Sequence, residues 1–148
     1  QSHILLNGEE VSEEIRQMPV SENVSKIAAI KEVRYEMVKK QQKMGKSKNM
    51  VMDGRDIGTT VFPAAELKIF MTADNAVRVE RRFKELYEKN PNITIEEVKA
   101  NLEMRDYIDS HREVSPLQKA ADAIVIDNTD ITPQQQLQVA LKYVRMKQ

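Results

Sequence analysis

Residues 49–71 read NMVMDGRDIGTTVFPAAELKIFM and contain two short apolar runs, at residues 49–52 and 67–71. A third run, Ala123–Ile126, follows later in the chain. Short apolar runs bounded by turn-forming residues predict buried β-strands. Helical patterns separate the three runs, and strands that alternate with helices are typical of a parallel sheet. We therefore predict an α/β fold, with ligands bound beyond the carboxyl ends of the strands.

The residues before this stretch predict a turn and a long helix. Asn7-Gly8 is a strong hairpin signal, and it predicts that a strand at residues 3–6 pairs with a strand upstream. Residues 11–19 predict one irregular helical turn. Ser21 is expected to cap a helix with apolar residues at every third or fourth position, and Gly45 is expected to end it.

The residues after this stretch predict three more helices. Asp74 is expected to start an Arg-rich helix that stops before Asn90-Pro91. Capping-box spacing then predicts a helix from Thr94, with Glu97, to about residue 109. The same spacing, Thr132 with Gln135, predicts the last helix.

Length and composition exclude several classes of protein. The 148 residues correspond to about one domain. Lys plus Arg and Asp plus Glu number 23 each, which argues against a nucleic-acid-binding protein or a polybasic membrane anchor. The chain has no cysteine and only two histidines, so thiolate chemistry is excluded and a zinc site is not expected. We expect a soluble, cytoplasmic protein without a membrane partner.

The turn at residues 53–59, Asp-Gly-Arg-Asp-Ile-Gly-Thr, is the first candidate site. Its two glycines permit tight turns, and Arg55 offers a planar fork suited to a phosphate. Asp56 is able to accept a hydrogen bond from an exocyclic amino group, as carboxylates do when they read cytosine. The alternative is an ordinary charged turn in which Arg55 pairs with Asp53 or Asp56.

Arg105, Asp109 and Arg112 form the second candidate site, because the i, i+4, i+7 spacing places them on one helical face. Two guanidiniums beside a carboxylate are able to hold a phosphate and a ribose hydroxyl together. The alternative is a surface ladder of salt bridges, each of which contributes about 0.3–0.5 kcal/mol.

Arg78, Arg81 and Arg82 share one face of the Arg-rich helix, with Glu85 close enough to pair with Arg81 or Arg82. A solvated surface has the same pattern. Phosphoryl transfer, however, uses arginines that converge on developing phosphate charge, and one such arginine is worth about 10³–10⁵ in rate.

Ser25 and Arg34 are nine residues apart and would lie on opposite faces of one straight helix. They share a ligand only if that helix breaks near Ile30; otherwise they are a capping serine and a solvated arginine. Gly45-Lys46-Ser47 matches the end of the phosphate-loop pattern G-x-x-x-x-G-K-S/T, but Lys40 stands where the first glycine is required. The basic segment 31–48 is interpreted as an exposed helix face.

Taken together, four stretches of the chain resemble the bacterial cytidylate kinases, over nearly its whole length and in that family's order. They are DGRDIGT at 53–59, VFP at 61–63, LKIF at 67–70 and RDYIDSHREVSPL at 105–117. The resemblance implies a three-layer P-loop nucleoside monophosphate kinase fold, with a parallel sheet flanked by helices. The implied reaction transfers the γ-phosphoryl group of ATP, with Mg²⁺, to CMP or dCMP.

The resemblance also implies roles for ten residues. Those assigned to the cytosine ring are Ser25, Arg34 and Asp56, and Arg55 is assigned to the monophosphate. Those assigned to the rest of the acceptor site are Arg105 for the phosphates, Asp109 for the ribose hydroxyls and Arg112. Arg81 and Arg82 match lid positions that approach the donor, so with Arg105 they form the implied catalytic set. Asp53 is implied to contact the Mg²⁺ shell indirectly.

The resemblance further implies that residues 1–48 are the remainder of the monophosphate-binding insert and residues 49–148 the C-terminal part of the core domain, with lid helices at about 74–112. The family's first strand and phosphate loop have no counterpart here, so we expect a chain truncated at its N-terminus, inactive alone and able to self-associate, from a monomeric parent. The strands near residues 52 and 70 are then not expected to pair directly.

The rival hypothesis is a non-catalytic α/β nucleotide-binding or helical interaction module that uses segment 31–48. An upstream phosphate-loop pattern in the parent reading frame would favour the kinase.

Overall fold

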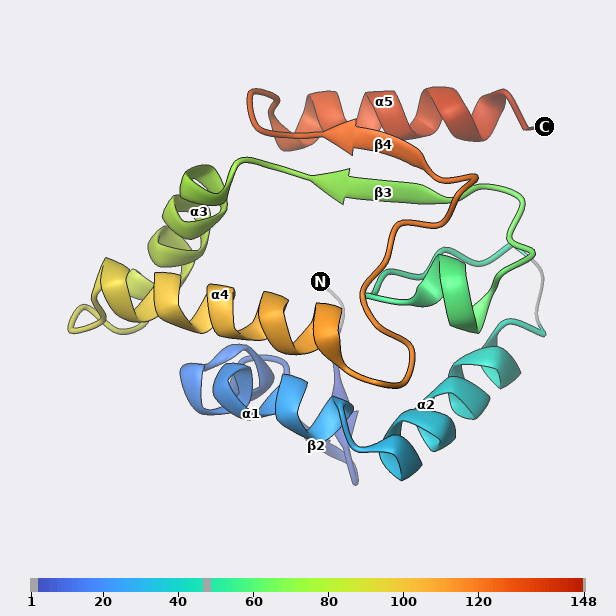
Figure 1. Ribbon diagram of the computed structural model, residues 1–148. Helices are drawn as coiled ribbons and strands as arrows, with labels where there is room; N and C mark the ends of the chain where they lie inside the picture. The colour runs from blue at the N-terminus through green and yellow to red at the C-terminus, as the bar shows by residue number, and fades with distance from the viewer. Residues whose placement is uncertain (1–2, 47–48, 148) are drawn as a thin grey trace.

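The computed structural model describes residues 3–46 and 49–147 (Figure 1). Five α-helices, four short strands and two short helical turns follow one another within those ranges. The strands and turns are β1 (Leu5–Leu6), β2 (Glu9–Glu10), η1 (Glu14–Arg16), η2 (Ile57–Val61), β3 (Ile69–Thr72) and β4 (Ile124–Asp127). The helices are α1 (Met18–Ala28), α2 (Lys31–Met44), α3 (Asn75–Tyr87), α4 (Ile95–His111) and α5 (Pro133–Arg145).

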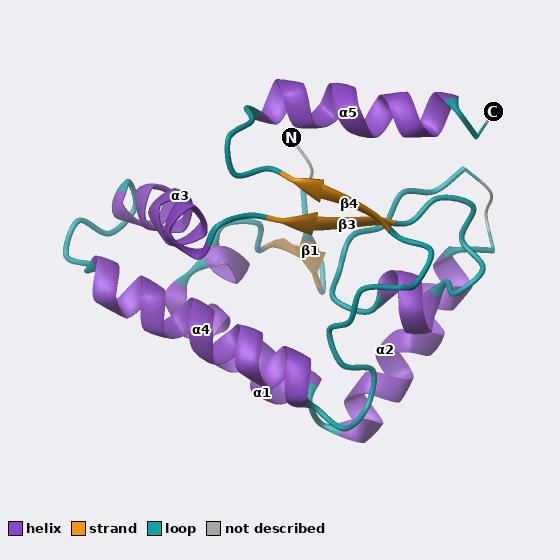
Figure 2. Cartoon of the chain, turned by 45° about the horizontal axis from the view of Figure 1, so that its top comes forward, coloured by secondary structure: helices purple, strands orange, loops and turns teal. Residues whose placement is uncertain are grey.

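β3 and β4 form a small parallel sheet, with Ile69 opposite Ile124 and Thr72 opposite Asp127. Both strands lie one or two residues from their predicted positions. Helix α5 runs alongside β4 in both views of the chain (Figures 1 and 2). A parallel pair joined through helices confirms the α/β class predicted from the apolar runs.

The strand predicted at residues 49–52 is wrong, because residues 50–53 are irregular. Within the described part of the chain, the two sheets pair β1 with β2 and β3 with β4, and residues 50–53 pair with none of these strands. An extended segment without a partner is not stable as a strand. Val51 is accordingly 97% exposed. The segments near Met52 and Phe70 do not pair, as expected, but the strand near Met52 that this expectation assumed is absent.

The N-terminal turn is confirmed, but its strand pairs downstream and not upstream. Leu6 lies opposite Glu9, and Leu5 opposite Glu10, across the two-residue turn Asn7-Gly8. Both turn residues have positive φ, 53° and 90°, as a type I′ hairpin turn requires. Such a turn reverses the chain at once, so the residues that follow it are the ones that pair.

The predicted long helix is two helices, α1 and α2, separated at Ala29 and Ile30. Ile30 has extended backbone angles, φ −68° and ψ 121°, which break the run. The predicted interruption near Ile30 is therefore confirmed. Ser21 is not a cap, because α1 starts at Met18, with Pro19 in the first turn, where proline's missing N–H is no loss.

Gly45 ends α2 as predicted, and it is also a point of close packing. A Cβ at this position would overlap the ring of Phe62. Any other side chain at this position would therefore require the Phe62 ring to move. Ser47, which completes the rejected phosphate-loop pattern, lies outside the described residues.

The later helices begin where the sequence predicts. The Asp74 carboxylate accepts from the Ala76 N–H at 2.8 Å, and both capping boxes are formed, at Thr94 and at Thr132. A buried cluster of Leu86, Ile93 and Val98 packs α3 against α4. Each side chain buried in this way contributes about 1.5–3 kcal/mol.

None of the helices in residues 3–46 and 49–147 combines the length and the apolar content that a membrane crossing requires.

Candidate functional site

A cavity of about 200 Å³ lies where α1, α2, the turn at residues 54–57 and the end of α4 meet. Four arginines and two aspartates line it, which gives the lining a net charge of +2. Seven of the ten predicted site residues are among the lining residues: Ser25, Arg34, Arg55, Asp56, Arg105, Asp109 and Arg112. The break after α1 is what allows Ser25 and Arg34 to face the same space.

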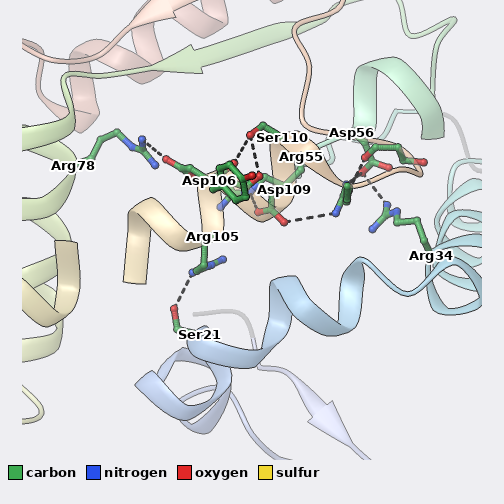
Figure 3. A network of polar contacts seen from close by, with 12 residues as sticks. Ser21, Arg34, Arg55, Asp56, Arg78, Arg105, Asp106, Asp109 and Ser110 are labelled. Carbon is green, nitrogen blue, oxygen red and sulfur yellow. Dashed lines mark hydrogen bonds and ion pairs between the residues drawn. The ribbon is translucent and has the colours of Figure 1, made fainter. Parts of the chain in front are cut away.

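Asp56 is the buried carboxylate at one end of this cavity, with 2% of its surface exposed. Its Oδ1 accepts from Arg34 Nη2 at 2.8 Å and lies 3.8 Å from Arg112 Nη2 (Figure 3). Arg34 Nη2 also donates to Gln41 Oε1 at 3.3 Å. Both arginines are themselves buried, and the Asp56 carboxylate compensates their positive charge in the absence of water.

Asp109 is the second buried carboxylate, and it joins α4 to the turn. Arg55 Nε donates to Asp109 Oδ2 at 2.8 Å, and Arg112 Nη1 lies 3.7 Å from Asp109 Oδ1. The alternative in which Arg55 pairs with Asp53 or Asp56 is therefore wrong. The surface ladder is also wrong, because Asp109 and Arg112 are buried and Arg112 lies just beyond the end of α4.

Arg105 does not pair with Asp109 but crosses to α1. Its Nη1 donates to Ser21 Oγ at 2.9 Å (Figure 3). Ser21 Oγ in turn donates to Asn101 Oδ1 at 2.8 Å. Burial, and then the repulsion of Arg55, lower the pKa of Arg105. Burial likewise lowers the pKa of Arg112, against the attraction of Asp56. Arginine keeps its charge in proteins, so a further anion beside these two side chains would offset the cost of their burial.

Several buried polar atoms of this cluster have no hydrogen-bond partner within the described ranges. They are three donors, Arg34 Nε, Arg105 Nε and Arg112 Nη2, and one acceptor, Asp56 Oδ2. Buried polar atoms are nearly always paired in native proteins, so such exceptions call for an explanation. A polar, anionic ligand in the cavity would supply the missing partners.

Three predicted site residues do not line this cavity. Arg81 donates to the Asn128 side chain and to two backbone carbonyls, of Asn128 and Thr129, just past β4. Arg82 pairs with Glu85 at 2.8 Å and donates to the Arg16 carbonyl. Asp53 is exposed, at the first position of the turn at residues 53–59.

Sequence reasoning missed Ser21 as a site residue, and it missed Asn101 and the ion pair between Arg78 and Asp106 altogether. Asn101 was detectable, because residues 101, 105 and 109 recur at intervals of four and share one face of α4. Ser21 carries no such signal, since its contacts are 80 and 84 residues away.

Comparison with known proteins gives one consistent result. A family model described as "Cytidylate kinase" matches residues 1–146. A "Cytidylate kinase" of Flavobacterium psychrophilum is 50% identical over 143 residues, 97% of this chain and 63% of that protein. One of Flavobacterium johnsoniae is 52% identical over 97% of this chain and 62% of its own length. One of Porphyromonas gingivalis is 58% identical over 88% of this chain and 57% of its own length. The chain thus spans about three-fifths of the length of the curated relatives it matches.

Proposed function

The chain belongs to the cytidylate kinase family, and from that premise we propose that its cavity is the acceptor site of a kinase that transfers the γ-phosphoryl group of ATP to CMP or dCMP. The observation that carries the proposal is the net charge of +2 around a cavity whose buried donors and single buried acceptor lack partners in the described chain. A nucleoside monophosphate brings a phosphate of charge about −1.5 to −2 at pH 7.

The base end of the cavity suits cytosine. Cytosine presents an amino group, which donates, where uracil presents an oxygen, which accepts. The free Asp56 Oδ2 is able to accept from that amino group, whereas it would repel the uracil oxygen. We assign Arg34 and Ser25 to the other polar atoms of the ring, because Arg34 Nε is a free donor beside Asp56 and the Ser25 hydroxyl lines the same cavity.

The opposite end suits the phosphate and the sugar. We assign Arg55 and Arg105 to the phosphate and Arg112 to the same acceptor pocket. Asp109 is assigned to the ribose hydroxyls, which are donors for a carboxylate. Arg55 now pairs with Asp109 through Nε alone, so its remaining N–H groups are available to a phosphate.

The arginines would also act on the reaction itself. Phosphoryl transfer depends mainly on positioning and on the stabilisation of charge that develops on the phosphoryl oxygens. Arg55 and Arg105 would hold the acceptor phosphate in place and reduce its repulsion of the incoming phosphoryl group. Each therefore acts on both binding and rate.

We assign Arg81 and Arg82 to the donor side, as lid residues within helices at about 74–112, and residues 1–48 to the monophosphate-binding insert. Arg81 would have to leave its bonds to Asn128 and Thr129 to reach a phosphate. In this proposal residues 49–148 belong to the core domain.

Asp53 is assigned an indirect contact with Mg²⁺, which neutralises charge on the transferring group when it is bound with ATP. Within the described ranges no three His, Asp or Glu side chains gather as metal ligands, and Asp53 is one exposed carboxylate. This fits Mg²⁺ held chiefly by nucleotide phosphates and water, since Mg²⁺ keeps several waters and takes one or two carboxylates.

Calorimetric titration with CMP, dCMP, UMP and ATP tests the proposal. CMP or dCMP should bind, UMP should bind about tenfold or more weakly, and ATP should bind more weakly than CMP. Turnover of ATP by this chain alone is not expected, because its 148 residues include no complete phosphate-loop pattern.

Arg34→Met keeps the apolar stem and removes the charge, and it should weaken CMP binding about 10–100-fold, as expected for the loss of a charged hydrogen bond. Lys39→Met on the same helix is the matched control, because Lys39 is exposed and pairs with Glu36. Tight ATP binding without CMP binding, or an Arg34→Met protein that binds CMP normally, would favour the rival non-catalytic module.

A further inference from the structure

Ser21 links the two helices that border the acceptor cavity. It lies on α1, and its hydroxyl contacts Arg105 of α4 at 2.9 Å (Figure 3). The same hydroxyl contacts Asn101 of α4 at 2.8 Å. Ser21 is 5% exposed and Asn101 7%, so the hydrogen bond between them is shielded from water, and the bond from Arg105 is partly buried. Bonds shielded in this way hold their geometry better than bonds on a surface.

The direction of both hydrogen bonds follows from the chemistry of the groups. Arginine has donors and no acceptor, so the Ser21 oxygen must accept from Arg105. The single hydroxyl hydrogen of Ser21 is then left for Asn101 Oδ1. Asn101 thereby determines where that hydrogen points and leaves the Ser21 lone pairs directed at Arg105.

This contact uses one side of the Arg105 guanidinium and leaves the other side free. Nη1 is bonded to Ser21, while Nε is buried without a partner in the described chain. The Nε–Nη2 edge is one of the two guanidinium edges that place two parallel N–H groups against neighbouring oxygens of a phosphate, and the other includes Nη1. Arg105 is also among the residues that line the cavity, where a bound anion would supply the acceptor that Nε lacks.

We propose that Ser21, oriented by Asn101, is a positioning residue that holds the Nε–Nη2 edge of Arg105 toward the nucleotide phosphate. The proposal rests on the proposed function, because it takes the cavity to be the monophosphate site. In this proposal the orientation of Arg105 depends on the packing of α1 against α4, because Ser21 lies on α1 and Arg105 on α4. The pKa of Arg105 is lowered, first by burial and then by the charge of Arg55, and the attraction of Asp109 opposes this shift only in part.

The test compares binding of CMP with binding of cytidine, which lacks the phosphate. Ser21→Ala removes the acceptor that aligns Arg105, so the ratio of the two affinities should fall about tenfold, while cytidine binding changes less than twofold. Ser21→Thr keeps the hydroxyl and should restore the ratio. Ser110→Ala is the matched control, because Ser110 is exposed on α4 and donates to the Asp106 and Tyr107 carbonyls of that helix.

A double-mutant cycle separates alignment from a general loss of structure. In an Arg105→Ala background, Ser21→Ala should leave the ratio unchanged, because no guanidinium remains to be aligned. An unchanged ratio in Ser21→Ala alone, or an equal fall in both backgrounds, would overturn the proposal. A wild-type protein that binds CMP no better than cytidine would instead overturn the proposed function, and the role of Ser21 would fall with it.

Discussion

Replacing Asp56 by asparagine removes the charge of the carboxylate that we assign to the cytosine amino group and keeps the size of the side chain. In the structure Oδ1 already accepts from Arg34 at 2.8 Å, whereas Oδ2 is buried without a partner in the described chain. The lost interaction is therefore one hydrogen bond from the base to a charged oxygen.

Such a hydrogen bond is worth about 1.5–3 kcal/mol, which corresponds to about 10–100-fold in affinity. An asparagine amide is also able to turn its NH₂ group toward uracil, which the carboxylate repels. The weaker binding of CMP and the stronger binding of UMP both lower the ratio of their affinities. The ratio of CMP affinity to UMP affinity should fall by about 10–100-fold, measured by calorimetry with each nucleotide.

The same substitution leaves Arg34 and Arg112 with a weaker partner. Breaking a buried ion pair costs about 3–5 kcal/mol, so thermal unfolding of Asp56→Asn has to be measured first, and binding recorded well below its midpoint. Asp122→Asn is the matched control. Asp122 has a 64% exposed side chain and pairs with Lys68, and its loss should leave the ratio unchanged.

A folded Asp56→Asn protein that keeps the wild-type ratio would refute the assignment, and the base would then have to be read elsewhere. Equal falls in CMP and UMP binding also keep the ratio, so they refute the assignment in the same way.

Two further predictions concern packing and association. Gly45→Ala places a methyl group against the Phe62 ring and should lower the free energy of unfolding by about 1–3 kcal/mol, measured by urea titration. A Gly45→Ala/Phe62→Leu protein should recover part of this loss. An unchanged urea midpoint in Gly45→Ala would contradict the close contact. The chain as given should self-associate at micromolar concentrations, because apolar side chains such as Val51 and Val125 are exposed. Light scattering that shows a single monomeric species over that range would contradict this prediction.

Features that depend on neighbouring residues were predictable. The Thr94 and Thr132 capping boxes and the Asp74 cap each join groups two or three residues apart, so residue types at a fixed spacing are enough to predict them. The break at Ile30 was also predictable, although only as the condition under which Ser25 and Arg34 share a ligand.

Features that depend on partners distant in the sequence were not predictable. Residues 49–52 have the composition of a strand, but a strand exists only where another strand pairs with it. Arg55 had two nearby carboxylates, yet it pairs with Asp109, 54 residues away. Spacing along the chain does not reveal which of several carboxylates the fold brings within reach.

The sequence alone was therefore enough to identify the α/β class, the family resemblance and seven residues that line one cavity. The resemblance groups these seven residues, because spacing alone would place Ser25 and Arg34 on opposite faces of one straight helix. Only the tertiary structure decided which arginine pairs with which aspartate, which polar atoms remain free, and that Ser21 faces Arg105. Those outcomes depend on the packing of α1 against α4, and contacts across about 80 residues of chain leave no periodic trace in the sequence.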